Sequence, residues 1–176
     1  MYAIKTYHLT KIYKSWRGKE TRAVHNLDLK IKEGEIFGFL GPNGAGKTTT
    51  IKMLLGLVFP TSGEFTIFGE KLSVDMKKKI GYLPEDPSFP PYFTAQEALS
   101  YYADLYELKK EEKEDKIKEL LELVSLGKYQ PKKITQFSRG MKQRLGLAQA
   151  LLADPDLVIF DDQNISPDKN LQELEG

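Results

Sequence analysis

The segment that most restricts how this chain can fold is FLGPNGAGKTTTIKMLLGLV, at residues 39–58. Four of its positions satisfy the spacing G-x-x-x-x-G-K-[ST]: Gly41, Gly46, Lys47 and Thr48. In such a loop the glycines let backbone N–H groups curl around phosphate oxygens, the lysine reaches the terminal phosphates, and the hydroxyl binds Mg²⁺. A glycine-rich turn between a strand and a helix is the simpler alternative.

The residues on both sides of the loop favour phosphate binding over a simple turn. Before it, EIFGFL (residues 35–40) is a short apolar run of the kind that forms a strand buried on both faces. After it, an amphipathic helix is predicted from the spacing of Ile51, Leu54, Leu55 and Val58. Strand, loop and helix in this order are the setting that the chemistry requires, so the segment predicts a chain that binds a nucleoside triphosphate.

Composition limits the other possibilities. The chain has 176 residues, of which 40% are apolar, which is enough for one hydrophobic core and short for two domains. Its net charge of +1 gives no reason to expect nucleic acid as a partner, and no apolar run approaches the roughly 18 residues that cross a bilayer. The start lacks a secretory signal, and the absence of cysteine excludes disulfides and thiolate chemistry. We therefore expect a single soluble, intracellular unit.

The hydrophobic pattern changes along the chain from strand-like to helical and back. HNLDLKI (residues 25–31) alternates as a half-buried antiparallel strand does. Thr94 and Glu97 predict a capping box at the start of a helix. A second helix is predicted from four apolar residues on one face: Ile117, Leu120, Leu121 and Val124. DLVIF (residues 156–160) then returns to a buried strand.

With these motifs in order along nearly the whole chain, the sequence resembles the ATP-binding subunits of ABC transporters, of the exporter type. LTKIY is similar to the adenine-stacking loop of that family, which implies that Tyr13 stacks on the base; a strand-end tyrosine in the core is the alternative. GPNGAGKTTT is similar to the Walker A motif. The resemblance implies that ATP is bound by Tyr13, Gly41, Pro42, Asn43, Gly44, Ala45, Gly46, Lys47, Thr48 and Thr49.

Two further segments resemble functional motifs of the same family. IGYLPED lies where the family has its Q-loop, with Glu85 in place of the usual glutamine, and an oxygen of Glu85 is expected to reach Mg²⁺ or its water. FSRGMKQRLG resembles the signature motif, and by itself is a capped helix start. The family uses this motif in trans, so Ser138 and Gly140 are expected to close over ATP held by a second copy in a head-to-tail dimer.

LVIFDD resembles the Walker B strand. By this resemblance Asp161, with Thr48 and Glu85, holds Mg²⁺, and Asp162 stands where the family normally has a glutamate that orients the attacking water. The likeness fades after Asp162: only Asp168 keeps a matching position in the D-loop, and no histidine follows His25 to contact the terminal phosphate. We therefore expect a shortened, divergent family member that binds Mg·ATP and hydrolyses it poorly.

The resemblance implies an α/β fold with a P-loop NTPase (RecA-like) core, an N-terminal antiparallel β portion and a helical insert. We expect one domain over residues 1–176, with its core in 1–85 and 150–176 and the insert, which carries the signature motif, in 86–149. The expected function is that of an ATP-binding subunit that couples ATP binding and hydrolysis to transport by a separate membrane protein, at the cytoplasmic face of the membrane. A truncated, non-hydrolysing nucleotide-binding module is the alternative. A family member acting on ribosomes or DNA is less expected, because those usually carry tandem domains or long coiled coils.

The aromatic stretch EDPSFPPYFTAQEALSYY lies where the family docks the coupling helix of its membrane subunit. We expect Phe89 and Tyr92 to be exposed there as part of an interface anchor. The alternative is that these aromatic side chains form the core of the helical insert.

Overall fold

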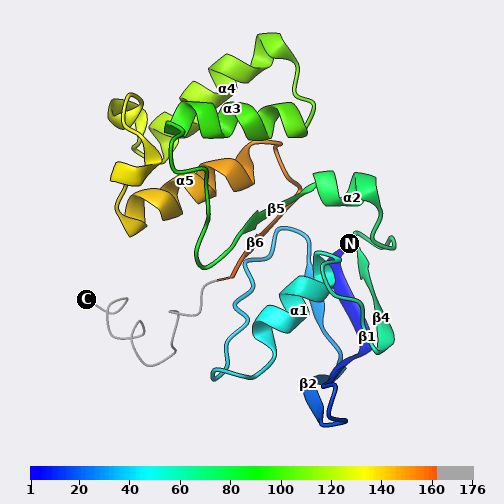
Figure 1. Cartoon of the computed structure of the whole chain (residues 1–176). Coiled ribbons are helices and arrows are strands. Elements are labelled where there is room, and N and C mark those ends of the chain that lie inside the picture. Colours follow the sequence, from blue (N-terminus) through cyan, green and yellow to red (C-terminus); the bar gives the residue numbers. More distant parts are fainter. Residues whose placement is uncertain (162–176) are drawn as a thin grey trace, which may run out of the picture. The chain divides into compact units, whose positions relative to one another are not determined.

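The computed structural model describes residues 1–161, whose helices and strands are drawn in Figure 1. These residues form two compact units, residues 1–77 and residues 78–161, and each is described by itself. The first is mainly antiparallel sheet and the second mainly helical, in the order that the sequence predicts. The proposed division into a core and an insert at residues 86–149 stays a prediction.

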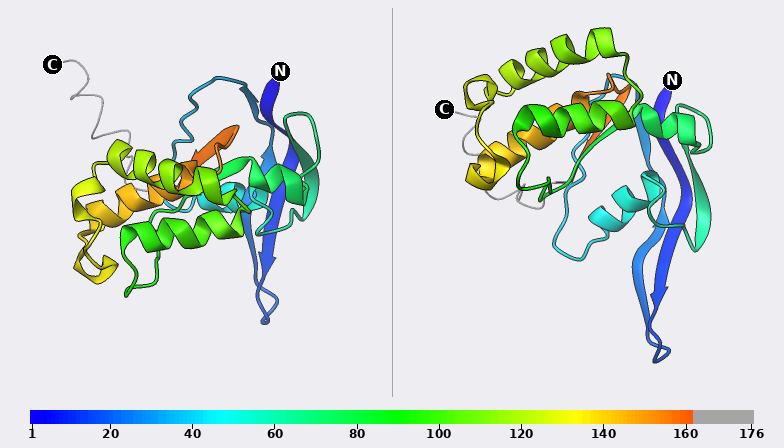
Figure 2. Two further views of the ribbon diagram at one scale, coloured as in Figure 1. Left: turned by 90° about the horizontal axis from the view of Figure 1, so that it is seen from above. Right: turned by 45° about the horizontal axis from the view of Figure 1, so that its top comes forward.

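The first unit is built on a four-stranded sheet in which a long central strand pairs with three others. Strand β1 (Tyr2–Lys14) pairs antiparallel with β2 (Glu20–Leu27), β3 (Lys30–Lys32) and β4 (Ser62–Ile67). Beyond the part of β1 that also pairs with β3 and β4, β1 and β2 continue as a two-stranded hairpin (Figure 2).

The segment HNLDLKI forms two strands where the sequence predicts one. Its inside-outside alternation is as predicted, since Ile31 is buried while its neighbours are exposed. The break between β2 and β3 lies at Asp28 and Leu29, shortly after Asn26, which has a positive φ of 52°. The buried hydroxyl of Thr6 bridges the break, because it donates to the carbonyl oxygen of Leu27 at 2.7 Å and accepts from the amide of Leu29 at 2.8 Å.

The apolar run at residues 35–40 is not a buried strand, so that prediction is wrong. Ile36 is fully exposed and Leu40 is more than half exposed. Within residues 1–161, no strand pairs with this segment. A strand needs a partner for its backbone N–H and C=O groups, and apolar composition alone does not supply one.

Helix α1 (Lys47–Leu54) packs on the sheet of the first unit through its apolar face. Ile51 and Leu54 are buried as predicted, and Met53 is completely buried. The helix ends at Leu54, so Val58 lies beyond it but still packs against the small core. That core consists of Leu9, Val24 and Met53, with Leu27, Val58 and Phe65 against them.

The second unit contains a two-stranded parallel sheet and three main helices. Short helix α2 (Val74–Lys78), of which all but Lys78 belongs to the first unit, comes before this sheet in the chain. In the second unit, strand β5 (Ile80–Leu83) pairs in parallel with β6 (Leu157–Phe160). Between these strands the chain forms α3 (Ala95–Leu105), α4 (Lys110–Leu123), the 3₁₀ turns Gly127–Tyr129 and Ile134–Gln136, and α5 (Arg139–Leu151).

The helices of the second unit enclose its hydrophobic core. The predicted capping box is present: the Thr94 hydroxyl accepts from the Glu97 amide at 3.2 Å, and the Thr94 amide donates to the Glu97 carboxylate at 2.7 Å. The predicted apolar face of α4 is also confirmed, since its four residues are buried in this core. Arg144 of α5 donates to the carbonyl oxygens of Val124 and Ser125, both at 3.2 Å, and so ties α5 to the end of α4.

Candidate functional site

The phosphate loop of the first unit joins residue 41 to α1 through two glycines with left-handed backbone. Gly44 and Gly46 both have φ of 86°. At Gly46 a side chain is excluded for a second reason, since a β-carbon there would lie 2.2 Å from the carbonyl oxygen of Ala23 and 3.0 Å from a methyl group of Val24. The loop is therefore packed against β2 at the residue where α1 begins.

The ammonium group of Lys47 lies over the loop. It donates hydrogen bonds to the carbonyl oxygens of Gly41 and of Pro42, the latter at 3.1 Å. The carbonyl oxygen of Gly46 accepts from both the amide and the hydroxyl of Thr50, at 2.8 and 3.0 Å, which fixes the first turn of α1. Gly46, the N-cap residue, has no side chain with which to cap this helix start. A helix N-terminus beside a lysine favours an anion.

Tyr13 lies near the end of β1, opposite Thr21 of β2. Its side chain is 41% exposed, so it does not belong to the core of the first unit. The Lys11 ammonium lies 5.2 Å from the centre of the ring. An exposed, flat aromatic face of this kind is available for stacking.

Glu85 and the signature segment both belong to the second unit, and they are directly connected. The amide group of Gln143, in α5, donates to the carbonyl oxygen of Glu85. Ser138 caps α5, because its hydroxyl accepts from the amide of Met141 at 3.2 Å. Gly140 has open space around it, since a β-carbon added there would meet no atom within 4 Å. Sequence reasoning missed Gln143, whose partner is 58 residues away.

Helix α5 approaches β5 closely at two glycines that sequence reasoning also missed. A β-carbon on Gly81 of β5 would lie 2.2 Å from the carbonyl oxygen of Ala150. One on Gly146 of α5 would lie 2.6 Å from Leu83 and 3.0 Å from Pro87. A glycine inside a strand or helix pattern is the available sequence signal for such an approach.

Asp161 follows β6 directly and is buried, with 7% of its surface exposed. Its amide continues the parallel ladder by donating to the carbonyl oxygen of Leu83 at 2.9 Å. The Tyr82 hydroxyl lies 3.4 Å from its carboxylate, and burial, followed by the Asp161 charge, raises the pKa of Tyr82. The Tyr82 hydroxyl therefore stays protonated and can donate to the Asp161 carboxylate. The predicted catalytic Asp162 and the D-loop Asp168 lie outside the described residues.

The side chains predicted to hold Mg²⁺ offer suitable donors, namely the hydroxyl of Thr48 and the carboxylates of Glu85 and Asp161. Hard oxygen ligands are those that Mg²⁺ prefers. Within residues 1–161, no three Asp, Glu, His or Cys side chains gather into a metal site. Mg²⁺ commonly binds through one or two carboxylates together with waters and substrate phosphates. Thr48 belongs to the first unit and Glu85 and Asp161 to the second, and each offers an oxygen of the type that suits a magnesium ion bound together with a nucleotide.

The aromatic segment after Glu85 corrects one expectation. Phe89 is buried, at 9% exposure, in the core of the second unit, where its ring meets that of Tyr102 edge-on with centroids 6.2 Å apart. It cannot serve as an exposed anchor. Tyr92 is 66% exposed, and its ring contacts Phe93, with centroids 5.4 Å apart. The two side chains differ in exposure because Phe89 packs in the core beside α3, whereas Tyr92 lies in the turn before α3.

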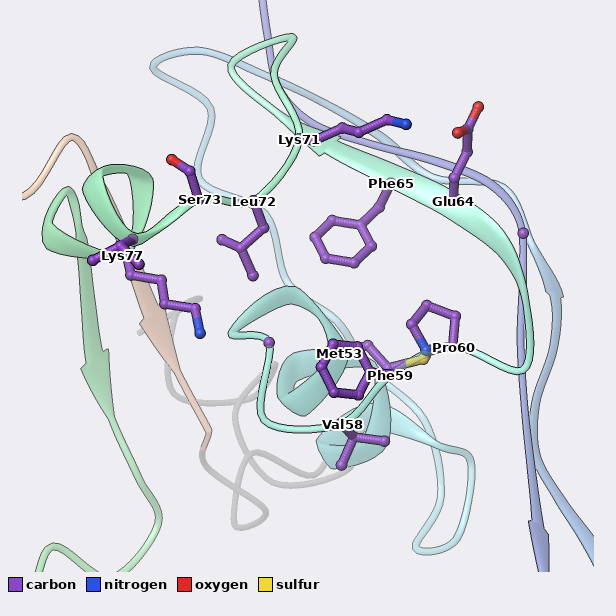
Figure 3. A pocket seen from close by; sticks show the side chains of 13 residues that line it. Met53, Val58, Phe59, Pro60, Glu64, Phe65, Lys71, Leu72, Ser73 and Lys77 are labelled. Atoms are coloured by element: carbon purple, nitrogen blue, oxygen red, sulfur yellow. The ribbon is translucent and has the colours of Figure 1, made fainter.

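A hollow of about 500 Å³ lies in the first unit beside the end of α1, and Figure 3 shows its lining. Met53, Val58 and Phe59 line one side, Phe65 and Leu72 face them, and the amine of Lys77 points inward. None of the lining residues is a predicted nucleotide-binding residue.

The described residues contain no helix that is both long enough and apolar enough to span a membrane.

Comparison with known proteins finds relatives over most of the chain. The sequence model of the family described as ABC transporter matches residues 24–164. The bacitracin transport ATP-binding protein BcrA of Bacillus licheniformis is 46% identical over 162 residues, which cover 90% of this chain and 50% of BcrA. The glycine betaine/carnitine/choline transport ATP-binding protein OpuCA of Bacillus subtilis is 37% identical over 164 residues, which cover 90% of this chain and 42% of OpuCA. The chain spans about half the length of the curated relatives it matches.

Solved structures of ATP-binding cassettes also resemble this chain. A dimeric ATP-binding cassette in a post-hydrolysis state, bound to ADP and Pi, matches with a TM-score of 0.81 and 30% identity. The match covers 97% of this chain and 78% of the chain in that structure. The ATP-binding subunit of an ABC transporter has a TM-score of 0.77 and 29% identity, over 90% of this chain and 65% of its own. The P-loop α/β fold class predicted from the sequence is thereby confirmed.

Proposed function

Because the chain belongs to the ABC transporter family, we propose that it binds Mg·ATP and couples ATP binding and hydrolysis to transport by a separate membrane protein. The observation that carries this proposal is the phosphate loop, in which Gly46, with a left-handed backbone, leads into the start of α1 and the Lys47 ammonium lies above the loop.

In this proposal the loop residues Gly41 to Thr49 surround the phosphates. The two loop carbonyls that now accept from Lys47 would give way to phosphate oxygens, which are charged and therefore stronger acceptors. Thr48 is the second residue of α1, directly after Lys47, and its hydroxyl would reach Mg²⁺. The exposed ring of Tyr13 would stack on the adenine.

The second unit would supply the groups that act at the terminal phosphate. Asp161 is already deprived of bulk water by burial, so its carboxylate would hold the magnesium shell, with Glu85 offering a further oxygen. Bound Mg²⁺ would neutralise charge that develops on the phosphates. Asp162, which lies outside the described residues, would orient the attacking water.

We further propose a head-to-tail dimer in which Ser138 and Gly140 of one copy close over the ATP of the other. The open space around Gly140 supports this assignment, because it lets an anion approach the backbone of the first turn of α5, and Ser138 stands at the same helix start, where its hydroxyl accepts from the Met141 amide. One solved relative is described as a dimeric ATP-binding cassette bound to ADP and Pi.

The partner would be a membrane-spanning transport subunit, which would place this protein at the inner face of the cell membrane. The names of BcrA and OpuCA describe transport ATP-binding proteins, and transport by this chain follows only as a proposal. Tyr92 remains available for such an interface, with its ring two-thirds exposed.

A non-hydrolysing nucleotide-binding module is the second candidate. It is favoured by Asp162, whose carboxylate is one carbon shorter than the glutamate that the family normally has there. Binding would then be retained while turnover is slow.

The test is a titration of the purified chain with Mg·ATP by calorimetry, together with phosphate release. Lys47→Ala should abolish detectable ATP binding with an unchanged circular dichroism spectrum, because the ammonium group donates to loop carbonyl oxygens and its loss removes a charged contact to phosphate. Lys52→Ala, which removes an exposed lysine from the same helix, is the matched control and should bind normally. Undiminished affinity in Lys47→Ala would overturn the proposal, and phosphate release separates the two candidate functions.

A further inference from the structure

The tip of the β1–β2 hairpin, defined as residues 14–22, is a feature that nucleotide binding does not use (Figure 2). Its turn is well built. The amide of Ser15 donates to the carbonyl oxygen of Lys19 at 2.9 Å, and the amide of Gly18 donates to that of Ser15 at 2.9 Å. The Ser15 hydroxyl accepts from the Lys19 amide at 3.2 Å, and Gly18 supplies the positive φ, 77°, that closes the turn. The backbone of the two residues between, Trp16 and Arg17, is thus enclosed in a hydrogen-bonded turn.

Trp16 is the only tryptophan of the chain, and its side chain is 87% exposed. The guanidinium carbon of Arg17 lies 4.7 Å from the centre of its ring. Tryptophan is a large amphipathic side chain that is highly buried on average in folded proteins. A tryptophan displayed on an ordered turn and paired with a cation therefore points to contact with something outside the first unit.

The charge of the hairpin tip indicates which kind of partner it would contact. Every residue from Lys14 to Arg22 is exposed, and four of the nine are basic: Lys14, Arg17, Lys19 and Arg22. Glu20 is the one acid, and it pairs with Lys14 at 2.8 Å. With four basic residues and one acid, the tip carries a net charge of +3. A negatively charged partner is favoured.

We infer that the hairpin tip docks on an anionic phospholipid surface, with Trp16 at the level of the lipid headgroups and Arg17, Lys19 and Arg22 toward lipid phosphates. Tryptophan is enriched at membrane–water interfaces, where its apolar ring and its N–H are both accommodated. Basic residues near an anionic leaflet are attracted to it. Single-stranded nucleic acid would instead call for a charged groove with several stacking rings, whereas this tip is a turn with one tryptophan.

The expected strength suits an orienting contact and not an anchor. Each basic residue near an anionic surface raises partitioning by roughly fivefold, so three of them give about a hundredfold. Partitioning that is raised only about a hundredfold is weak for a protein free in solution. It becomes effective when another contact already holds the protein near the bilayer, because the second contact is then intramolecular. The inference does not depend on ATP binding, so Lys47→Ala should dock on lipid as the unchanged chain does.

The experiment uses Trp16 as its own probe, since no other tryptophan contributes to the emission. The full chain is titrated with vesicles of phosphatidylcholine alone or of phosphatidylcholine with phosphatidylglycerol, and the tryptophan emission and its quenching by iodide are recorded. With the anionic vesicles the emission should shift to the blue and become protected from iodide, and with the neutral vesicles it should not. Raising the salt concentration should reverse the shift.

Two double variants separate the tip from general charge. R17Q/K19Q should weaken partitioning to anionic vesicles by roughly thirtyfold. K109Q/K110Q, which removes the same charge at the start of α4, should leave it unchanged, and circular dichroism checks that both are folded. The inference is overturned if the two double variants weaken binding equally, if neutral vesicles shift the emission as much as anionic ones, or if only an RNA oligonucleotide shifts it.

Discussion

A β-carbon on Gly46 would lie 2.2 Å from the carbonyl oxygen of Ala23, closer than any real contact of these atoms. The phosphate loop and β2 therefore touch backbone to backbone at the start of α1. Gly44 has the same φ of 86° but nothing within 4 Å of its β-carbon position. The two glycines separate the effect of backbone conformation from the effect of close packing.

We predict that Gly46→Ala destabilises the protein more than Gly44→Ala. The left-handed conformation alone should cost Gly44→Ala about 1–2 kcal/mol in the free energy of unfolding. Gly46→Ala carries the same strain and must in addition move α1 away from β2, so its loss should be clearly larger. Urea unfolding followed by circular dichroism measures both. Equal losses would mean that the approach of Gly46 to Ala23 does not constrain the loop.

A second prediction concerns turnover. Asp162→Glu should raise the rate of ATP hydrolysis, by up to about a hundredfold, because a carboxylate that falls about 1 Å short of its water loses that much. ATP affinity should not change, since Lys47 and the loop are untouched. Phosphate release under saturating Mg·ATP is the measurement. Asp156→Glu, the same lengthening before β6, is the control and should have no effect. If the unchanged chain already hydrolyses ATP as fast as Asp162→Glu, the shorter acid is not limiting.

The capping box of α3 predicts a pH dependence of stability. The hydrogen bond from the Thr94 amide, followed by that with its hydroxyl, lowers the pKa of Glu97 from its ordinary value of 4.5. The ionised carboxylate is favoured in the folded protein, so its contribution is complete above the unfolded pKa and is lost as the pH falls through the lower folded pKa. Glu97→Gln should therefore lower the Tm at pH 7, and the gap to the unchanged chain should close in acid.

Thermal unfolding between neutral and strongly acidic pH tests this. Glu119→Gln, on the exposed side of α4, is the matched control for removing one carboxylate. A gap for Glu97→Gln that stays constant over the whole range would show that the charge of Glu97 does not strengthen the cap.

A fourth prediction separates stability from ATP-driven pairing at the start of α5. Ser138→Ala removes the hydroxyl that accepts from Met141 and should cost about 1 kcal/mol of stability. Gly140→Ala meets no neighbouring atom and should leave stability unchanged or slightly raised, because alanine favours a helix. If both residues close over ATP in trans, both variants should weaken ATP-dependent dimerisation in analytical ultracentrifugation. A Gly140→Ala protein that dimerises normally with ATP would remove Gly140 from the interface.

The sequence predicted best those parts whose cause is local. The cap at Thr94, the buried face of α4 and the glycines of the phosphate loop each follow from residues a few positions apart. The pairing of Tyr82 with Asp161 and of Gln143 with Glu85 joins residues far apart in the chain, and no short pattern specifies such partners.

The two clear errors have a common physical origin. The apolar character of residues 35–40 predicts burial, but Ile36 is exposed because a strand also needs hydrogen-bonding neighbours. The aromatic cluster near Phe89 predicts an exposed anchor, but Phe89 is buried because a small helical unit needs large side chains to fill its core. A hydrophobic segment favours burial, but whether it is buried depends on tertiary partners that the segment itself does not specify.

The parallel pairing of β5 with β6 also determines when the second unit can form during translation. Ile80 pairs with Leu157, so β5 leaves the ribosome long before its partner has been synthesised. At about 5–20 residues per second, β5 waits for several seconds without a neighbour, while β1 to β4 can already pair. The nascent chain therefore exposes an unpaired strand edge throughout the synthesis of α3, α4 and α5, and this interval is when a ribosome-associated chaperone would have most to protect.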